Sequence, residues 1–164
     1  MKNHQLLSLT LHEIPTVRQL AREIWNEHYI KILSQQQIDY MLGLFYSAEK
    51  IQSEMENGVI WEMLWDNQKP AGYLVCKIEP EKIYISKIYL KAETRGKGYG
   101  KFLLNRAREL AIQNHKKAIY LNVNKHNMDS IAFYERNGFA KTDEGIFDIG
   151  NGFVMDDYIL ELKV

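Results

Sequence analysis

Residues 83–104 read IYISKIYLKAETRGKGYGKFLL and join three local patterns. From Ile83 to Leu90 the chain is rich in β-branched and aromatic residues, a composition typical of a strand. Three glycines at alternate positions follow, and from Lys101 to His115 apolar residues recur at helical spacing. A strand, a glycine loop and a helix in this order favour anion binding, because backbone N–H groups and the helix N-terminus can both donate to one anion.

Two better-known nucleotide-binding loops do not fit this stretch. A Walker A loop needs a glycine where the chain has Arg95, and a hydroxyl side chain where it has Phe102. A dinucleotide-binding loop has the pattern G-x-G-x-x-G, and here the third glycine, Gly100, comes one residue too early. The loop therefore predicts a phosphate site of a different kind.

The composition of the chain is that of an ordinary globular protein. Its 164 residues are 46% hydrophobic and 26% charged, which is enough to bury a core in one domain without disulfides. The 21 basic and 21 acidic side chains cancel, so nucleic acid is not an expected partner. No Cys/His spacing suggests a metal site, and the single cysteine, Cys76, lies in an apolar run and is expected in the core. Neither a signal peptide nor a membrane span is indicated, so we expect a cytoplasmic protein without a membrane partner.

Periodicity along the rest of the chain predicts the order β, two or three helices, βββ, α, β, α, ββ. This order indicates an α+β fold in which helices cover a central mixed sheet that is mostly antiparallel and twisted. Helices are expected over residues 14–32, after a cap at Ser34, from Ser47 to Met55, and from Met128 to Asn137 between Asn127 and Gly138. The remaining strands are expected at residues 5–11, 59–65, 71–78, 118–123, 139–148 and 153–162.

Two segments carry a family resemblance. Arg95, Gly98 and Gly100 fit R-x-x-G-x-G, and the run from Asn122 to Asn127 is followed by AFYERNGF at residues 132–139. Both resemble the GNAT superfamily of N-acetyltransferases, whose signatures read Q/R-x-x-G-x-G/A and L-x-V-x-x-x-N, then A-x-x-F-Y-E-K-x-G-F. Residues 34–41 and 150–158 are similar to a bacterial subgroup that includes spermidine/spermine-type acetyltransferases.

The resemblance implies one N-acetyltransferase domain over residues 1–164, with a three-layer α/β/α fold whose sheet is splayed at the acetyl-CoA site. It implies direct transfer of an acetyl group from acetyl-CoA to a primary amine of a small molecule, with a polyamine as one acceptor to consider. Acetylation of a protein N-terminus or lysine, and a non-catalytic module that binds coenzyme A, stay open as alternatives. Many relatives form homodimers, and the C-terminal strands would be the place for such a contact.

The resemblance also assigns roles to single residues. Tyr134 is the candidate general acid, since a phenol with a pKa of about 10 can protonate a thiolate formed beside it; the alternative is a half-buried helix tyrosine. Asn127 could bind the cofactor, cap its helix or do both. The full set expected to bind the cofactor is Ile88, Tyr89, Leu90, Arg95, Gly96, Lys97, Gly98, Tyr99, Gly100, Lys101, Asn127 and Tyr134.

The general base and the acceptor pocket are less well defined. Many relatives carry a glutamate on the strand before the glycine loop, but residues 83–89 contain no carboxylate. Glu27, His28 or a water chain could then remove the proton. Asp156 and Asp157 are expected to form an exposed pair at the start of a strand. They could also attract a cationic substrate. The early-helix candidates for the amine pocket are Trp25, His28, Tyr29, Tyr40 and Tyr46. His28 could instead be a solvated helix residue, and each of the other four could be a core residue.

Overall fold

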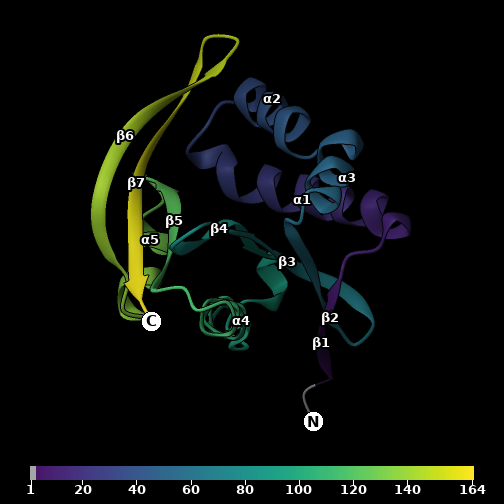
Figure 1. The fold of residues 1–164 in the computed structure, drawn as a ribbon. Helices are drawn as coiled ribbons and strands as arrows, with labels where there is room; N and C mark the ends of the chain where they lie inside the picture. Colours follow the sequence, from purple (N-terminus) through teal and green to yellow (C-terminus); the bar gives the residue numbers. More distant parts are fainter. Residues whose placement is uncertain (1–2) are drawn as a thin grey trace. The chain divides into compact units, whose positions relative to one another are not determined.

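The computed structural model describes residues 3–164, which form two compact units. The first unit contains residues up to Lys77 together with Lys87–Leu104, and the second contains Ile78–Ser86 together with Asn105–Val164. Strand β4 (Lys82–Leu90) and helix α4 (Tyr99–Gln113) each contribute several residues to both units, and the last residue of strand β3, Ile78, also belongs to the second unit. Figure 1 shows the ribbon with these elements labelled.

The strands of the first unit form an antiparallel array. Strand β2 pairs with β1 in the register His4↔Asp66 and with β3 in the register Ile60↔Cys76. Cys76 is buried and forms no disulfide, as its apolar surroundings predict. The strands are β1 (His4–Ser8), β2 (Ile60–Asp66) and β3 (Lys69–Ile78).

Three helices of the first unit contact one another, as Figure 1 shows. Both predicted serine caps are confirmed, because Ser34 and Ser47 each accept a hydrogen bond of 3.1 Å from the backbone N–H three residues later. Tertiary packing buries the apolar stripe of the first helix, including Val17 and Ile24. The helices are α1 (Ile14–His28), α2 (Gln35–Phe45) and α3 (Ala48–Glu56).

Short 3₁₀ turns replace the ends of two predicted elements. The first strand was expected to reach Leu11, but a turn begins there (Leu11–Glu13), because the Glu13 carboxylate accepts hydrogen bonds of 2.9 Å from both the N–H and the hydroxyl of Thr10. The first helix ends at His28 and continues as a second turn, Tyr29–Lys31, instead of reaching residue 32. A third turn, Ala92–Thr94, follows β4.

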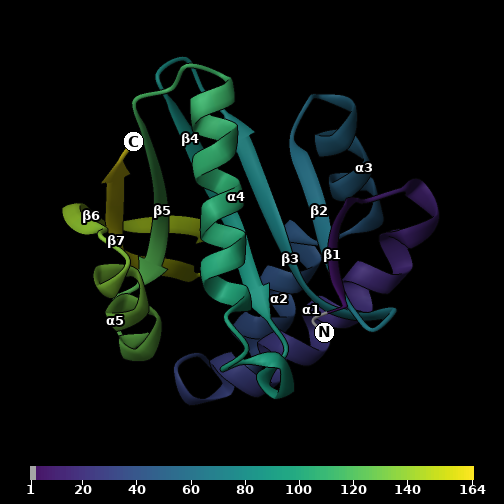
Figure 2. The same cartoon turned by 90° about the horizontal axis from the view of Figure 1, so that it is seen from below.

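The second unit is built on a long hairpin, drawn in yellow-green and yellow in Figure 1. Its strands join through residues 150–152, all with positive φ (88°, 55° and 79°), so the predicted turn is confirmed. Gly138, with φ 95°, ends the preceding helix as predicted. Figure 2 shows that helix near the strands of the unit. The elements are β5 (Ala118–Asn124), α5 (Met128–Arg136), β6 (Ala140–Gly150) and β7 (Phe153–Lys163).

Strand β4 has residues in both units, and its neighbours in the sheet are β3 and β5. Its first residues pair in parallel with β5, from Lys82↔Ala118 to Tyr84↔Tyr120, whereas β5 pairs antiparallel with β7. The hydrogen-bonded order is β1-β2-β3-β4-β5-β7-β6. The described residues thus contain five α-helices and a mixed, mostly antiparallel, seven-stranded sheet, and the predicted α+β class is confirmed. None of the helices in residues 3–164 has the length and apolar content needed to cross a membrane.

Candidate active site

The glycine loop has a backbone that only glycine adopts readily at two positions. Gly96 and Gly98 have φ values of 79° and 83°, in the left-handed region. A Cβ built on Gly96 would meet nothing within 4 Å, so open space lies beside this backbone. Helix α4 begins at Tyr99, two residues before the predicted start. The first N–H groups of a helix lack acceptors within it, so this loop and first turn fit a diphosphate.

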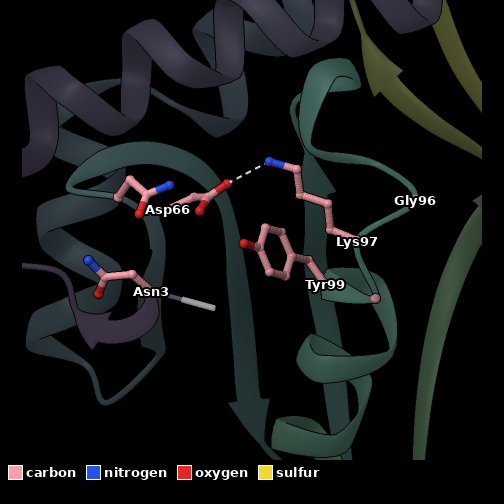
Figure 3. A pocket seen from close by; sticks show the side chains of 7 residues that line it. Asn3, Asp66, Gly96, Lys97 and Tyr99 are labelled. Carbon is pink, nitrogen blue, oxygen red and sulfur yellow. Dashed lines mark hydrogen bonds and ion pairs between the residues drawn. The ribbon is translucent and has the colours of Figure 1, made fainter. Parts of the chain in front are cut away.

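The basic side chains of the loop are engaged by the protein itself. The Lys97 ammonium donates to the Asp66 carboxylate at the end of β2 (3.1 Å), as Figure 3 shows. Hydrogen bonds from Lys97 and then from Tyr99 hold the pKa of Asp66 below its ordinary value. The Arg95 guanidinium donates to the carbonyl oxygen of Leu90 (3.3 Å). A cavity of about 530 Å³ beside the ion pair is lined by Asn3, Asp66, Asn67, Gly96, Lys97, Gly98 and Tyr99.

The end of β4, which contains the predicted cofactor residues 88–90, packs closely on β3. A Cβ on Gly72 would lie 2.4 Å from the carbonyl oxygen of Tyr89, so only glycine allows this approach. A further hydrogen bond fixes the residue that follows β4, because the N–H of Lys91 donates to the carbonyl oxygen of Ala71 (2.8 Å). The strand end that leads into the glycine loop is therefore held firmly by its neighbour.

Two predicted pocket residues meet at this strand end. Rings of Trp25 and Tyr29 lie 4.7 Å apart, and the Trp25 ring lies 5.7 Å from that of Tyr89. The hydroxyls of Tyr29 and Tyr89 form a hydrogen bond of 2.9 Å. Burial raises the pKa of Tyr89 well above its ordinary value, so its hydroxyl stays protonated. His28 is half-buried and places its ring 4.9 Å from that of Tyr29.

The other two aromatic candidates differ from each other. Tyr46 is buried, and its hydroxyl is paired with that of Tyr73 at 2.8 Å, which makes it a core residue. Tyr40 is half-buried on α2. Glu27, one of the two side chains considered as general base, is exposed on α1.

One buried cation was not singled out by sequence reasoning. Lys87 on β4 is 9% exposed, and its ammonium lies 5.2 Å from the ring centroids of both Tyr46 and Trp61. Burial lowers its pKa, while the nearby charge of Glu54 opposes that shift. The sequence signal was the one charged residue in the strand Ile83–Leu90.

In the second unit, Tyr134 and Asn127 are both buried, with 7% and 5% exposure. Tyr134 lies on α5, with its ring 5.6 Å from Phe133 and 5.7 Å from Phe139, so it is more deeply packed than the half-buried alternative supposed. Asn127 stands at the N-cap position of α5 but its side chain makes no capping hydrogen bond. The expected cap position is right, and the expected side-chain cap is wrong.

The expectation of an exposed aspartate pair is wrong, because Asp156 is half-buried and Asp157 is buried. Asp157 on β7 is 3% exposed, and its carboxylate accepts a hydrogen bond of 3.5 Å from the side-chain amide of Asn122 on β5. Burial raises the pKa of Asp157 to about 6, although the Asn122 hydrogen bond opposes the shift. Asp156 points its carboxylate at the ammonium of Lys125 instead. Neighbouring residues of a strand face opposite sides, so only one of the pair enters the unit.

Comparison with known proteins places this geometry in a family. The sequence model described as the Acetyltransferase (GNAT) family matches residues 15–139, about three quarters of the chain. The chain belongs to the GNAT family of acetyltransferases. It is therefore an acyltransferase that uses acetyl-CoA, as the resemblance implied. The glycine loop and the Asn127–Phe139 segment, which carried that resemblance, both lie inside the matched range.

Individual relatives of this GNAT protein differ in the amine that their names give as acceptor. Spermidine N(1)-acetyltransferase of Thermoplasma acidophilum is 26% identical over 93% of this chain and 95% of the relative. The crystal structure of PaiA N-acetyltransferase from the same organism, in complex with coenzyme A, has a TM-score of 0.85 at 26% identity and covers 99% of both chains. Peptidyl-lysine N-acetyltransferase YjaB of Salmonella typhimurium is 24% identical over 64% of this chain and 67% of the relative.

Proposed function

We propose that this enzyme acetylates a primary amine of a small cationic molecule, with a polyamine of the spermidine type as the first candidate. The observation that carries the proposal is the similarity to a spermidine N(1)-acetyltransferase over nearly the full length of both chains. The aromatic cluster of Trp25, Tyr29 and Tyr89 supports it, because aromatic rings attract ammonium groups. We propose that these three residues, with His28, form one wall of the amine site.

The glycine loop is proposed to bind the pyrophosphate of acetyl-CoA through its backbone. Because the ammonium of Lys97 is bonded to Asp66, the loop's contribution is expected from N–H groups of residues 96–101 and from the N-terminus of α4. The Arg95 guanidinium is exposed and is proposed to screen the phosphate charge. When bound, acetyl-CoA supplies the acetyl group, whose bond to sulfur breaks as the new C–N bond forms.

Three further groups complete the proposed cofactor and acid assignments. Backbone groups of Ile88, Tyr89 and Leu90 orient the thioester arm and polarise its carbonyl. Tyr134 donates the proton that the departing sulfur needs. The side-chain amide of Asn127, at the start of α5, is proposed as a further cofactor ligand.

A second candidate is acetylation of a peptide lysine. It is favoured by the relative that acts as a peptidyl-lysine N-acetyltransferase, which matches about two thirds of this chain. Spermidine and a lysine side chain offer the same chemistry, a primary ammonium on an alkyl chain. The two substrates differ in the size of the group at the far end of the alkyl chain that carries the reacting amine.

A thiol-release assay with acetyl-CoA tests both candidates. Spermidine, spermine, putrescine, a lysine peptide and a peptide with a free N-terminus would be compared by kcat/KM. We expect the highest value with a polyamine, and mass spectrometry of the product would show one added acetyl group. A higher value with the lysine peptide would replace the first candidate by the second. Tight coenzyme A binding without turnover of any amine would leave only a binding module.

A further inference from the structure

We propose that Lys87 places a fixed positive charge beside the amine site, and that this charge makes the bound substrate ammonium give up its proton more readily. The inference rests on the proposed amine site, and every residue that places Lys87 beside that site belongs to the first unit. It gives a source of neutral amine to an enzyme whose strand before the glycine loop contains no carboxylate.

The ammonium of Lys87 lies in a cage of three aromatic rings. Its distance to the ring centroid is 5.2 Å for Tyr46, 5.2 Å for Trp61 and 6.0 Å for Phe45. Lys87 is only 9% exposed, and among residues 3–164 no carboxylate forms an ion pair with it. Ring faces attract a cation but carry no net charge, so they hold the ammonium in place without cancelling its field.

Aromatic rings connect this cage to the proposed wall of the amine site. Lys87 and Tyr89 are two residues apart on β4, so their side chains point to the same face of the strand. The Trp25 ring of the wall lies 5.7 Å from Tyr89 and also 5.7 Å from Tyr46 of the cage. The Tyr73 ring, 5.4 Å from Tyr89 and 5.9 Å from Tyr46, makes a second connection. A single ring, that of Tyr46, therefore links the ammonium to the wall.

The charged groups around Lys87 do not neutralise it. From α3, the charge of Glu54 favours the ammonium and that of Lys50 disfavours it, and these two side chains lie 3.9 Å apart. From α1, the Arg18 guanidinium donates to the carbonyl oxygen of Tyr46 (2.8 Å), which adds another cation. Burial lowers the pKa of Lys87, whereas the ring faces of its cage favour the charged form.

The tyrosine hydroxyls of the cluster stay neutral. Burial raises the pKa of Tyr46, Tyr73 and Tyr89 far above the ordinary value of a phenol. None of these three groups therefore supplies a negative charge at neutral pH that could screen Lys87 from the amine site.

Coulomb's law gives the size of the expected effect. Two unit charges about 10 Å apart in a partly buried site shift each other's pKa by about one unit. A primary alkylammonium has a pKa of about 10.4, so at pH 7.5 roughly one molecule in a thousand is neutral in water. A fixed cation would raise the neutral share of the bound amine about tenfold and weaken binding of the charged form by the same factor.

The other buried charge of the first unit is a poorer way to obtain neutral amine. Glu62 is 6% exposed and follows Trp61 directly on β2. Neighbouring residues of a strand face opposite sides, so Glu62 points away from the face that carries the cage. Glu27 on α1 is exposed, and a carboxylate in water is a weak base for an alkylammonium.

The proton balance of the step is as follows. The ammonium nitrogen gives one proton to solvent, and the neutral amine then forms the C–N bond as the C–S bond breaks. The nitrogen loses a second proton as the amide forms, while the sulfur gains one from Tyr134, which is reprotonated in turn. The net change is ammonium plus thioester to amide, thiol and one released proton. Lys87 keeps its own proton throughout.

The experiment compares Lys87→Met with the matched control Lys91→Met. Both changes replace a lysine by an uncharged side chain of similar length, but the ammonium of Lys91 is already paired with Glu23 (3.6 Å) and Glu93 (3.3 Å). Lys87→Arg, which keeps the charge, is the rescue variant. The kcat and KM for spermidine would be measured from pH 6.5 to 9.5, and coenzyme A affinity by calorimetry.

We expect Lys87→Met to lower kcat and KM together, each about tenfold at pH 7.5, so that kcat/KM stays within ~3-fold. The acid limb of the kcat profile should move up by about one pH unit, because the bound ammonium then holds its proton more tightly. Lys91→Met should leave both constants within ~2-fold, and Lys87→Arg should keep the wild-type limb. A Lys87→Met enzyme with an unchanged limb, or with kcat lowered equally at every pH and KM unchanged, would overturn the proposal.

Two measurements on the wild-type enzyme decide the matter if Lys87→Met fails to fold. A ¹³C NMR titration of the lysine ε-carbons, with the Lys87 peak assigned by its absence in Lys87→Arg, should show a charged Lys87 at pH 7.5. Calorimetry of spermidine binding to the enzyme–coenzyme A complex at pH 9, in buffers of different ionisation enthalpy, should show proton release. A neutral Lys87, or proton uptake on binding, would overturn the proposal.

Failure of the proposed substrate gives a different result. If the enzyme turned over a lysine peptide but no polyamine, the small-molecule proposal would fall. The joint fall of kcat and KM and the moved limb, measured with that peptide in Lys87→Met, would still decide the role of Lys87.

Discussion

The ammonium of Lys97 lies 3.1 Å from the carboxylate of Asp66 and ties the glycine loop to the end of β2. The same carboxylate accepts a hydrogen bond from Tyr99, the first residue of α4. Asp66 therefore contacts the residues on both sides of Gly98, and Figure 3 shows its bond to Lys97. We therefore expect the backbone of the loop, and not its lysine, to be the main phosphate ligand.

Backbone recognition predicts a contrast between two substitutions in the loop. Gly98→Ala places a Cβ on a residue with φ 83°, which costs about 1–2 kcal/mol, or roughly 5- to 30-fold in affinity for coenzyme A. Lys97→Met should weaken binding less than ~3-fold, because its ammonium is already bonded to Asp66 and is partly exposed. Calorimetry with coenzyme A measures both. A larger loss for the lysine variant would mean that its side chain turns to the phosphate on binding.

The proposed general acid predicts a selective loss of turnover. Tyr134→Phe removes only a hydroxyl, so its ring contacts with Phe133 and Phe139 are kept. We expect kcat to fall at least ~10-fold while coenzyme A affinity stays within ~2-fold. Steady-state kinetics and calorimetry on the same preparation give the two values. Unchanged kcat would remove Tyr134 from the mechanism.

The aromatic cluster predicts an effect on the acceptor alone. Tyr29→Leu removes a ring that we place at the amine site, and loss of one cation–π contact of about 0.5–2 kcal/mol should raise the KM for spermidine roughly 2- to 30-fold. Tyr73→Phe is the control, because Tyr73 is fully buried and bonded to Tyr46. It should lower the free energy of unfolding by about 1–3 kcal/mol and leave that KM unchanged. Equal KM values for both variants would place the amine elsewhere.

The buried carboxyl predicts an unusual dependence of stability on pH. The pKa of Asp157 is raised to about 6 in the folded chain, above about 3.9 in an unfolded one, so between these values the folded state binds more protons. Stability should therefore fall as pH rises from about 4 to 6, and at pH 7 the ionised carboxylate costs up to about 3 kcal/mol. Asp157→Asn should be more stable than wild type at pH 7, with the difference gone below pH 4. Urea unfolding at pH 4 and 7 measures this, and equal stabilities at both would contradict it.

Local patterns in the chain were enough to predict most elements of the fold. The serine caps at Ser34 and Ser47, the glycine stop at Gly138 and the turn at residues 150–152 all rest on contacts between residues close in sequence. Misplaced ends occurred where a side chain competes for the backbone, as Glu13 does at Thr10. The cap position at Asn127 was also predicted, but its buried side chain makes no capping hydrogen bond.

The family and its cofactor follow from sequence because a phosphate loop works through contiguous backbone: the glycines at 96, 98 and 100 give both its shape and its donors. The neighbours of single polar side chains do not follow in this way. Alternation says that one of Asp156 and Asp157 faces inward, but only the register Asn124↔Asp157 decides which one, and only burial beside Asn122 gives that carboxyl its chemistry. Strand register and burial depend on residues far apart in the chain, and for that reason tertiary structure alone assigns Lys97 to Asp66 and identifies Asp157 as the buried acid.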